Sequence, residues 1–129
     1  FSIMTKILVV DDEADLEMLV KQKFRKKIRE NIYEFIFAQN GEEALQKVSE
    51  HPDLEIILSD INMPVMDGIT FVKTAKQMPN CKFVPIVMLS SEEDEAKIAE
   101  AKQVGISTFL RKPVKEVQLK TILQVVLGS

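Results

Sequence analysis

Five side chains that could do chemistry stand where short apolar runs of the sequence end. Asp11 and Asp12 follow the first run, Asp60 the third, Ser90 the fourth, and Lys112 lies just after the fifth. Carboxylate oxygens suit a hard divalent cation such as Mg²⁺. A lysine ammonium supplies a compact charge that holds a phosphoryl oxygen, and a serine hydroxyl can hydrogen-bond another. Brought together, these groups favour phosphoryl transfer to a carboxylate, where positioning and charge neutralisation do most of the catalysis.

The elements that must position these groups are short strands alternating with amphipathic helices. The strand-like runs are rich in Val, Ile and Leu, as in strands buried on both faces of a parallel sheet, and cover residues 6–10, 33–38, 56–59, 84–89 and 108–110. Between and after them, apolar residues recur at helical spacing, which predicts five helices around residues 16–28, 44–48, 71–75, 98–104 and 119–126.

Five strands alternating with five helices predict an α/β fold, a doubly wound parallel sheet covered on both faces. In such folds ligands bind beyond the carboxyl ends of the strands. We therefore expect the five side chains to converge on one edge of the sheet. No linker or internal repeat suggests a second domain, so residues 5–127 are predicted as one unit, with residues 1–4 and 128–129 as terminal additions.

Composition and charge exclude several classes of protein. The net charge of −3 gives the chain no general attraction to nucleic acid, and we interpret the basic cluster of residues 21–29 as the solvated face of a helix. A single cysteine, Cys81, cannot form a disulfide or a thiolate metal site within one chain. No apolar run approaches the roughly 20 residues of a membrane span. We expect a cytoplasmic protein that binds neither membrane nor nucleic acid directly.

Four segments together resemble the receiver domains of two-component response regulators, including the chemotaxis receivers. They are VVDDE at 9–13, SDINMPVMDG at 59–68, PIVMLSS at 85–91 and FLRKP at 109–113, in the expected order and at the expected separations. The resemblance spans nearly the whole chain. It implies a flavodoxin-like fold with the strand order 2-1-3-4-5.

The resemblance assigns a phosphoacceptor and a metal site. Asp60 matches the aspartate that takes a phosphoryl group from the phosphohistidine of a kinase. Asp12 looks like the direct ligand of Mg²⁺ (or Mn²⁺), and Asp11 like its supporting or water-mediated neighbour. Asp60 and the backbone carbonyl of Asn62 would complete the metal shell.

The resemblance also implies three further roles. Ser90 matches the hydroxyl that moves toward the phosphoryl group, and Lys112 the lysine that pairs with its oxygens, next to a Lys112–Pro113 bond that is usually cis. Phe109 stands at the aromatic switch position but lacks the hydroxyl of the commoner tyrosine. Val114 replaces a frequent phenylalanine.

As a signalling module rather than an enzyme, the domain would catalyse only its own phosphorylation and slow dephosphorylation. Its partners would be a histidine kinase or phosphotransfer protein, and an unidentified effector domain or target. The last helix, the fifth strand and the helix before it would form the switching surface. Val117 and Val125 are expected off the buried stripe of the last helix, where a partner or a homodimer contact is conceivable. Asn62 and Glu92 occupy positions that tune phosphoryl lifetime in the family.

Several alternatives stay open at the level of sequence. A phosphatase of the haloacid dehalogenase type would need an acid two residues after its nucleophile, where Asp60 has Asn62. A flavodoxin-like cofactor carrier would need a phosphate loop rich in Ser, Thr and Gly after the first strand. A receiver used only as a scaffold is a third alternative. Locally, the acids at 11–13 and the serines at 90–91 could be helix caps, and Phe109 could simply be packed in the core.

Overall fold

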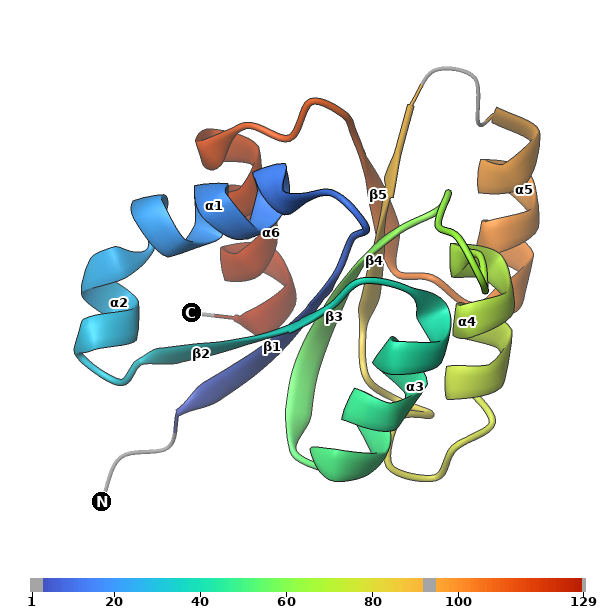
Figure 1. Ribbon diagram of the computed structural model, residues 1–129, viewed down its shortest axis with the longest axis horizontal. Helices are drawn as coiled ribbons and strands as arrows, with labels where there is room; N and C mark the ends of the chain where they lie inside the picture. The colour runs from blue at the N-terminus through green and yellow to red at the C-terminus, as the bar shows by residue number, and fades with distance from the viewer. Residues whose placement is uncertain (1–3, 92–94, 129) are drawn as a thin grey trace.

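The computed structural model describes residues 4–91 and 95–128, folded as one sheet between two layers of helices (Figure 1). The strands are β1 (Thr5–Val10), β2 (Tyr33–Ala38), β3 (Leu54–Asp60), β4 (Ile86–Ser90) and β5 (Thr108–Arg111). The helices among the described residues are α1 (Ala14–Lys23), α2 (Arg25–Arg29), α3 (Gly41–Glu50), α4 (Gly68–Ala75), α5 (Glu95–Val104) and α6 (Glu116–Leu127).

The sheet has the predicted topology. Its five strands are all parallel and follow the order β2-β1-β3-β4-β5. Val10 pairs with Ser59, Asp60 with Leu89 and Ser90 with Arg111, so the carboxyl ends of four strands lie nearly level. The register therefore brings the residues that follow β1, β3, β4 and β5 to one edge of the sheet.

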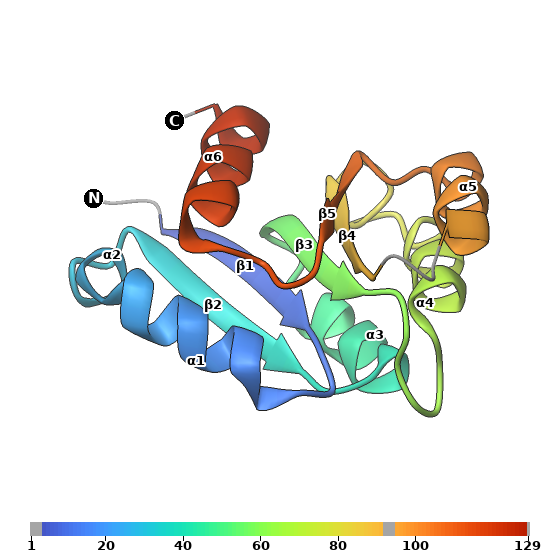
Figure 2. The same ribbon diagram turned by 90° about the horizontal axis from the view of Figure 1, so that it is seen from above.

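Alternate side chains of the strands supply two separate apolar cores. Leu8 and Val10 of β1 belong to the core under α3, α4 and α5, whereas Ile7 and Val9 belong to the core under α1, α2 and α6. Figure 2 shows the two helical layers on opposite faces of the sheet. Because both faces are buried, the strands read in the sequence as continuous apolar runs rather than as alternating ones.

The helix count is one higher than predicted, because the helix expected around residues 16–28 is two helices. It breaks at Phe24, where φ is −109° and ψ is 20°. The Phe24 ring is buried and packs on Tyr33 and Phe35 of β2, with ring centroids 5.9 and 5.7 Å apart. We attribute the break between α1 and α2 to this packing, because burying the Phe24 ring against the edge strand β2 requires the chain to leave the path of a single straight helix.

Element boundaries differ slightly from those predicted. β4 begins after Pro85, which has no N–H to donate to the sheet, although its carbonyl oxygen still accepts a hydrogen bond from Ile57 at 3.0 Å.

Two loops at the carboxyl edge of the sheet end in a side chain that caps the following helix. Asn40 accepts from the backbone N–H of Glu43 at the start of α3, and Asp67 accepts from Thr70 at the start of α4, each at 2.8 Å.

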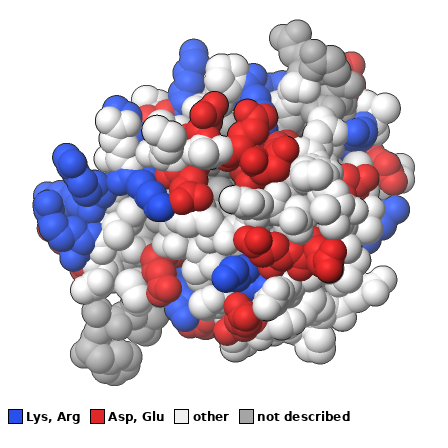
Figure 3. All heavy atoms as spheres, in the orientation of Figure 1, with Lys and Arg blue, Asp and Glu red and all other residues white. Residues whose placement is uncertain are grey.

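The basic cluster is a solvated helix face, as predicted. Arg25, Lys26, Lys27 and Arg29 are exposed on α2, and Figure 3 shows Lys and Arg side chains gathered at that end of the molecule. Lys21 forms a 2.6 Å ion pair with Glu17 on the same helix. None of the described helices combines the length and apolar character needed to cross a bilayer.

Gly68 allows the first turn of α4 to sit directly against the end of β3. A Cβ atom at this position would overlap the carbonyl oxygen of Asp60 and come within 2.7 Å of the Met88 Cε atom. The backbone N–H of Gly68 donates to the carbonyl oxygen of Ile61 at 2.8 Å. The glycine is therefore needed for close approach between helix and strand.

We predict that Gly68→Ala destabilises the protein by roughly 1–3 kcal/mol or more, the usual cost of overpacking, although alanine is the better helix former. Urea unfolding measures the effect. Gly128→Ala is the control, because Gly128 has a φ of +72° but open space around it, so only a backbone cost of about 1 kcal/mol is expected. A Gly68→Ala variant as stable as the parent would contradict the packing described here.

Candidate functional site

Three carboxylates meet at the carboxyl edge of the sheet. One oxygen from each of Asp11, Asp12 and Asp60 lies within 4.8 Å of the others. The side chains of Asp11 and Asp60 are each 6% exposed, whereas Asp12 faces solvent. Carboxylates this close repel one another, and an oxygen-only donor set suits a hard divalent cation. The cluster therefore fits the predicted metal site and contains all three predicted carboxylate ligands.

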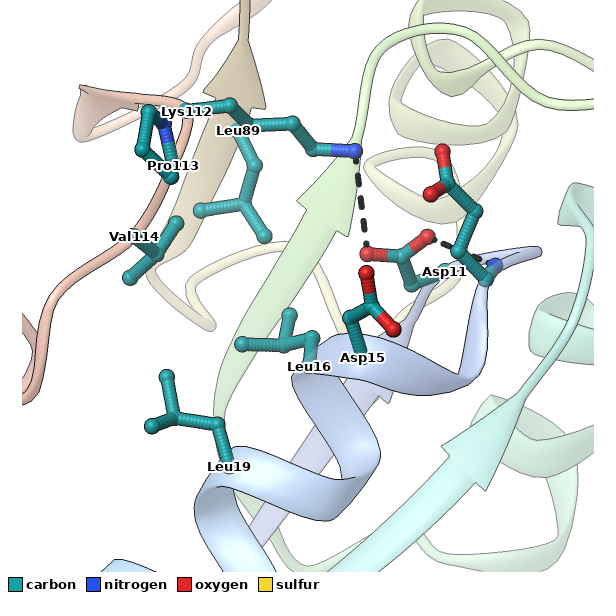
Figure 4. A pocket seen from close by; sticks show the side chains of 9 residues that line it. Asp11, Asp15, Leu16, Leu19, Leu89, Lys112, Pro113 and Val114 are labelled. Carbon is teal, nitrogen blue, oxygen red and sulfur yellow. Dashed lines mark hydrogen bonds and ion pairs between the residues drawn. The ribbon is translucent and has the colours of Figure 1, made fainter.

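Lys112 brings the balancing positive charge into the same place. Its backbone N–H donates to the carbonyl oxygen of Ser90 at 2.7 Å, which holds the residue at the end of β4. Its Nζ lies 2.6 Å from Asp60 Oδ2 and 3.7 Å from Asp11 Oδ2. Figure 4 shows the ammonium directed toward Asp11. The Lys112–Pro113 peptide bond is cis, as the resemblance implied.

The pKa shifts reflect this crowding. Burial raises the pKa of the Asp11 carboxyl, with further increases from Asp60 and Asp12. The backbone N–H of Glu13 and the charge of Lys112 lower it, but by less. Burial would lower the pKa of Lys112, but its hydrogen bond to Asp60 and the neighbouring carboxylates outweigh that effect and raise it. The ammonium therefore stays charged beside the acids.

Both oxygens of the Asp60 carboxylate have partners. Oδ2 is held by Lys112, and Oδ1 accepts a hydrogen bond from the backbone N–H of Asn62 at 3.2 Å. The side chain of Asn62 binds α5 instead, because its Oδ1 accepts a hydrogen bond from the Lys97 ammonium. Asn62 thus connects the loop after β3 both to the Asp60 carboxylate and to α5.

Two hollows open beside the cluster. One of about 340 Å³ is lined by Asp12, Glu13, Asp60, Asn62, Ser91 and Lys112. The other, of about 380 Å³, lies between the start of α1 and the segment after β5 (Figure 4). Its lining combines acids with apolar side chains, including Leu16, Leu19 and Val114. The Asp60 carboxylate therefore lines a hollow open to solvent, although its own surface is almost fully covered.

The capping alternative does not account for Asp11. The N-cap of α1 is Glu13, which makes no side-chain capping bond, and Asp11 instead accepts from the Glu13 N–H at 2.9 Å. Ser90 is the last residue of β4 and is fully buried, and its Oγ has no hydrogen-bond partner within residues 4–91 and 95–128. An unsatisfied buried hydroxyl is costly and needs an explanation. It stands at the edge where the predicted phosphoryl group would be bound.

Phe109 lies half-buried at the margin of the core under α3, α4 and α5. The Lys102 ammonium and the Arg111 guanidinium lie 5.3 and 5.7 Å from its ring centroid. Arg111 also donates to the carbonyl oxygen of Ser91 at 3.0 Å. The ring is neither fully packed in the core nor free, and its role as a switch stays a prediction.

Sequence reasoning missed Lys97 and Arg111. Lys97 lies 35 positions from its partner Asn62 in the sequence, and Arg111 lies 20 positions from its partner Ser91. No local sequence pattern could therefore have identified these two contacts. Glu92, expected to tune phosphoryl lifetime, lies outside the described residues.

Comparisons with known proteins identify the family of the chain. The family described as the response regulator receiver domain matches residues 7–124. The chain is 32% identical to the chemotaxis protein CheY1 of Helicobacter pylori over 96% of its own length and 98% of that protein. The structure of CheY4, a chemotaxis response regulator of Vibrio cholerae, superposes with a TM-score of 0.85 at 37% identity, covering 96% and 99% of the two chains.

A third match bears on the metal. The receiver domain of the sensor histidine kinase PA1611 from Pseudomonas aeruginosa PAO1 superposes with a TM-score of 0.84 at 25% identity. The match covers 98% of this chain and 100% of that one. That crystal structure contains a magnesium ion coordinated in the active site cleft.

We predict that Asp11→Asn stabilises the metal-free protein at pH 7 by on the order of 1 kcal/mol, since it removes a buried charge and, to a smaller extent, its repulsion from Asp60 and Asp12. A raised pKa means that the folded protein favours the neutral form of this carboxyl. Parent stability is therefore lost as pH rises from the ordinary value through the raised one, and the gain from Asn grows over that window. Urea unfolding with a chelator, at pH 3 and pH 7, measures both effects.

Asp53→Asn is the matched control. Asp53 forms a 3.0 Å ion pair with Lys6 that lowers its pKa, so its replacement should give no gain at pH 7. A loss of stability in Asp11→Asn at pH 7 would show that Asp11 is favourably paired rather than crowded.

Proposed function

The chain belongs to the response regulator receiver domain family, and on this premise we propose that Asp60 accepts a phosphoryl group from a phosphohistidine. The donor would be a histidine kinase or a phosphotransfer protein. The observation that carries the proposal is the position of the Asp60 carboxylate. It lies 2.6 Å from the Lys112 ammonium, among the other acids, at the floor of a hollow open to solvent.

In the transfer, an Asp60 carboxylate oxygen attacks phosphorus and the phosphorus–nitrogen bond to the donor imidazole breaks. The electron pair of that bond goes to the imidazole nitrogen. The imidazole leaves as the neutral ring if its other nitrogen already carries a proton, and otherwise takes one from solvent. The Asn62 N–H and the Lys112 ammonium hold the carboxylate in one orientation before the donor arrives. After transfer, Lys112 is placed to compensate charge on the phosphoryl oxygens.

Asp11, Asp12, Asp60 and the carbonyl oxygen of Asn62 would hold Mg²⁺, or Mn²⁺ in its place. When bound, the metal would neutralise negative charge on the phosphoryl oxygens. The crowding of three carboxylates supports this assignment, because Lys112 alone leaves an excess of negative charge at the site. The chain's own contribution is a fixed arrangement of oxygen donors on rigid strand ends.

The phosphoryl group would shift an equilibrium between two conformations. Ser90 is suited to respond, because its buried hydroxyl has no hydrogen-bond partner among the residues that the structure describes. The half-buried Phe109 ring would then move inward as the Ser90 hydroxyl moves. The surface that changes would be α5, β5 and α6, where Val117 and Val125 are 74% and 72% exposed, as expected. An effector domain, a target protein or a second copy of the chain would bind there.

The remaining expectations complete the proposal. The receiver unit would span residues 5–127 and act in the cytoplasm, without direct contact with nucleic acid or membrane. It would catalyse only its own phosphorylation and slow dephosphorylation. The family match weighs against the phosphatase and cofactor-carrier alternatives. The scaffold alternative predicts a different outcome in the experiment below, because a scaffold needs no reactive aspartate.

We predict that incubation with acetyl phosphate and Mg²⁺ adds the mass of one phosphoryl group, measured by intact mass spectrometry. Asp60→Asn should abolish the gain, and a chelator should reduce it strongly in the parent. Asp67→Asn is the matched control in the same loop, since asparagine preserves the N-cap of α4. No gain in the parent, or a gain that survives Asp60→Asn, would refute the proposal.

A further inference from the structure

Lys97 reaches from α5 to the loop that carries the acceptor. It stands in the first turn of the helix, and its ammonium donates a hydrogen bond to the side-chain oxygen of Asn62. The two residues are 35 positions apart, so the contact joins two segments that only the fold brings together. Nothing in the proposed transfer reaction uses Lys97.

Asn62 connects that lysine to the reactive group. Its backbone N–H donates to Asp60 Oδ1 at 3.2 Å, while its side-chain oxygen accepts from Lys97. Asn62 also lines the hollow of about 340 Å³ that opens over Asp60. Because the Asp60 side chain is almost fully covered elsewhere, this hollow is the route by which a water molecule would reach a phosphoryl group on it.

The other described cations near this face are engaged elsewhere. Lys102 of α5 lies over the Phe109 ring, and Lys73 of α4 pairs with Glu100 at 3.4 Å. Arg111 binds the Ser91 carbonyl, and Lys112 binds Asp60 itself. Among the described residues, Lys97 is the cation that binds the Asn62 side chain.

We propose that Lys97 is a positioning residue that prolongs the life of the aspartyl phosphate by holding the Asn62 carboxamide oxygen away from attacking water. The inference rests on the proposed function of Asp60. In hydrolysis, a water oxygen bonds to phosphorus and the bond from phosphorus to the Asp60 oxygen breaks. The products are the Asp60 carboxylate, inorganic phosphate and one proton released to solvent.

The carboxamide oxygen matters because it is a hydrogen-bond acceptor beside the path of that water. An oxygen released from Lys97 can accept a hydrogen bond from the water and orient it toward phosphorus. An oxygen held by an ammonium has one of its two lone pairs engaged, and the rotation of its amide group is restricted, so the oxygen is held toward α5 rather than turned to the water. The contact with Lys97 thus slows hydrolysis without touching the reacting atoms.

The test measures phosphoryl lifetime. Protein loaded with acetyl phosphate and Mg²⁺ is desalted rapidly, and the phosphorylated fraction is followed by intact mass spectrometry. Lys97→Ala should shorten the lifetime by about two- to tenfold, the range corresponding to one hydrogen bond. Lys97→Arg, which keeps a donor, should restore most of it. Lys73→Ala is the matched control, because it removes an exposed lysine that bridges to α5 without contacting Asn62.

A second background separates positioning from a general effect of charge. Asn62→Ala keeps the backbone N–H and carbonyl but removes the carboxamide, so Lys97→Ala should have no further effect in it. An unchanged or longer lifetime in Lys97→Ala would overturn the inference, as would equal shortening in Lys73→Ala or in the Asn62→Ala background. A parent that gains no phosphoryl mass would instead refute the proposed function, and the inference with it.

Discussion

The crowding of three carboxylates around one ammonium is the constraint on which the site depends. Asp11 and Asp60 are nearly covered by protein, and Asp12 stands beside them in solvent. Burial and like charge both disfavour the ionised form of the Asp11 carboxyl, and Lys112 offsets only part of that cost. A protein gains no stability from such an arrangement by itself. The excess negative charge makes sense if the site receives a divalent cation and a phosphoryl group.

The scaffold keeps the three carboxylates together through sheet pairing, capping and close packing, because they do not attract one another. Parallel pairing aligns the ends of β1, β3, β4 and β5, and the cap of Asp67 fixes where α4 begins. Gly68 then lets α4 approach the backbone of Asp60. The loop between them also holds Val65 at a φ of +69°, a conformation that valine rarely adopts. Strain of this kind persists only where the surrounding structure enforces it.

The residues at the strand ends could be predicted because a local pattern, an apolar run followed by polar residues, marks them in the sequence. A buried parallel strand reads as an apolar run, and the polar residues at or just after its carboxyl end must lie at one edge of the sheet. This logic located Asp11, Asp12, Asp60, Ser90 and Lys112, and the family resemblance supplied the strand order. It failed where distant packing decides the outcome. The break at Phe24 depends on two aromatic rings of β2, and the contact of Lys97 with Asn62 joins α5 to the loop after β3 across 35 positions.

The central claim is that these oxygens and the lysine enclose one metal ion and one phosphoryl group. A crystal structure of the protein with Mg²⁺ and beryllium trifluoride, a mimic of the phosphoryl group, tests it most directly. The account predicts the trifluoride on an Asp60 oxygen, with Mg²⁺ about 2.1 Å from oxygens of Asp12, Asp60 and the Asn62 carbonyl. The Lys112 ammonium and the Ser90 hydroxyl should contact the mimic. Metal bound at another surface, or an Asp60 that stays unmodified beside Lys112, would contradict it.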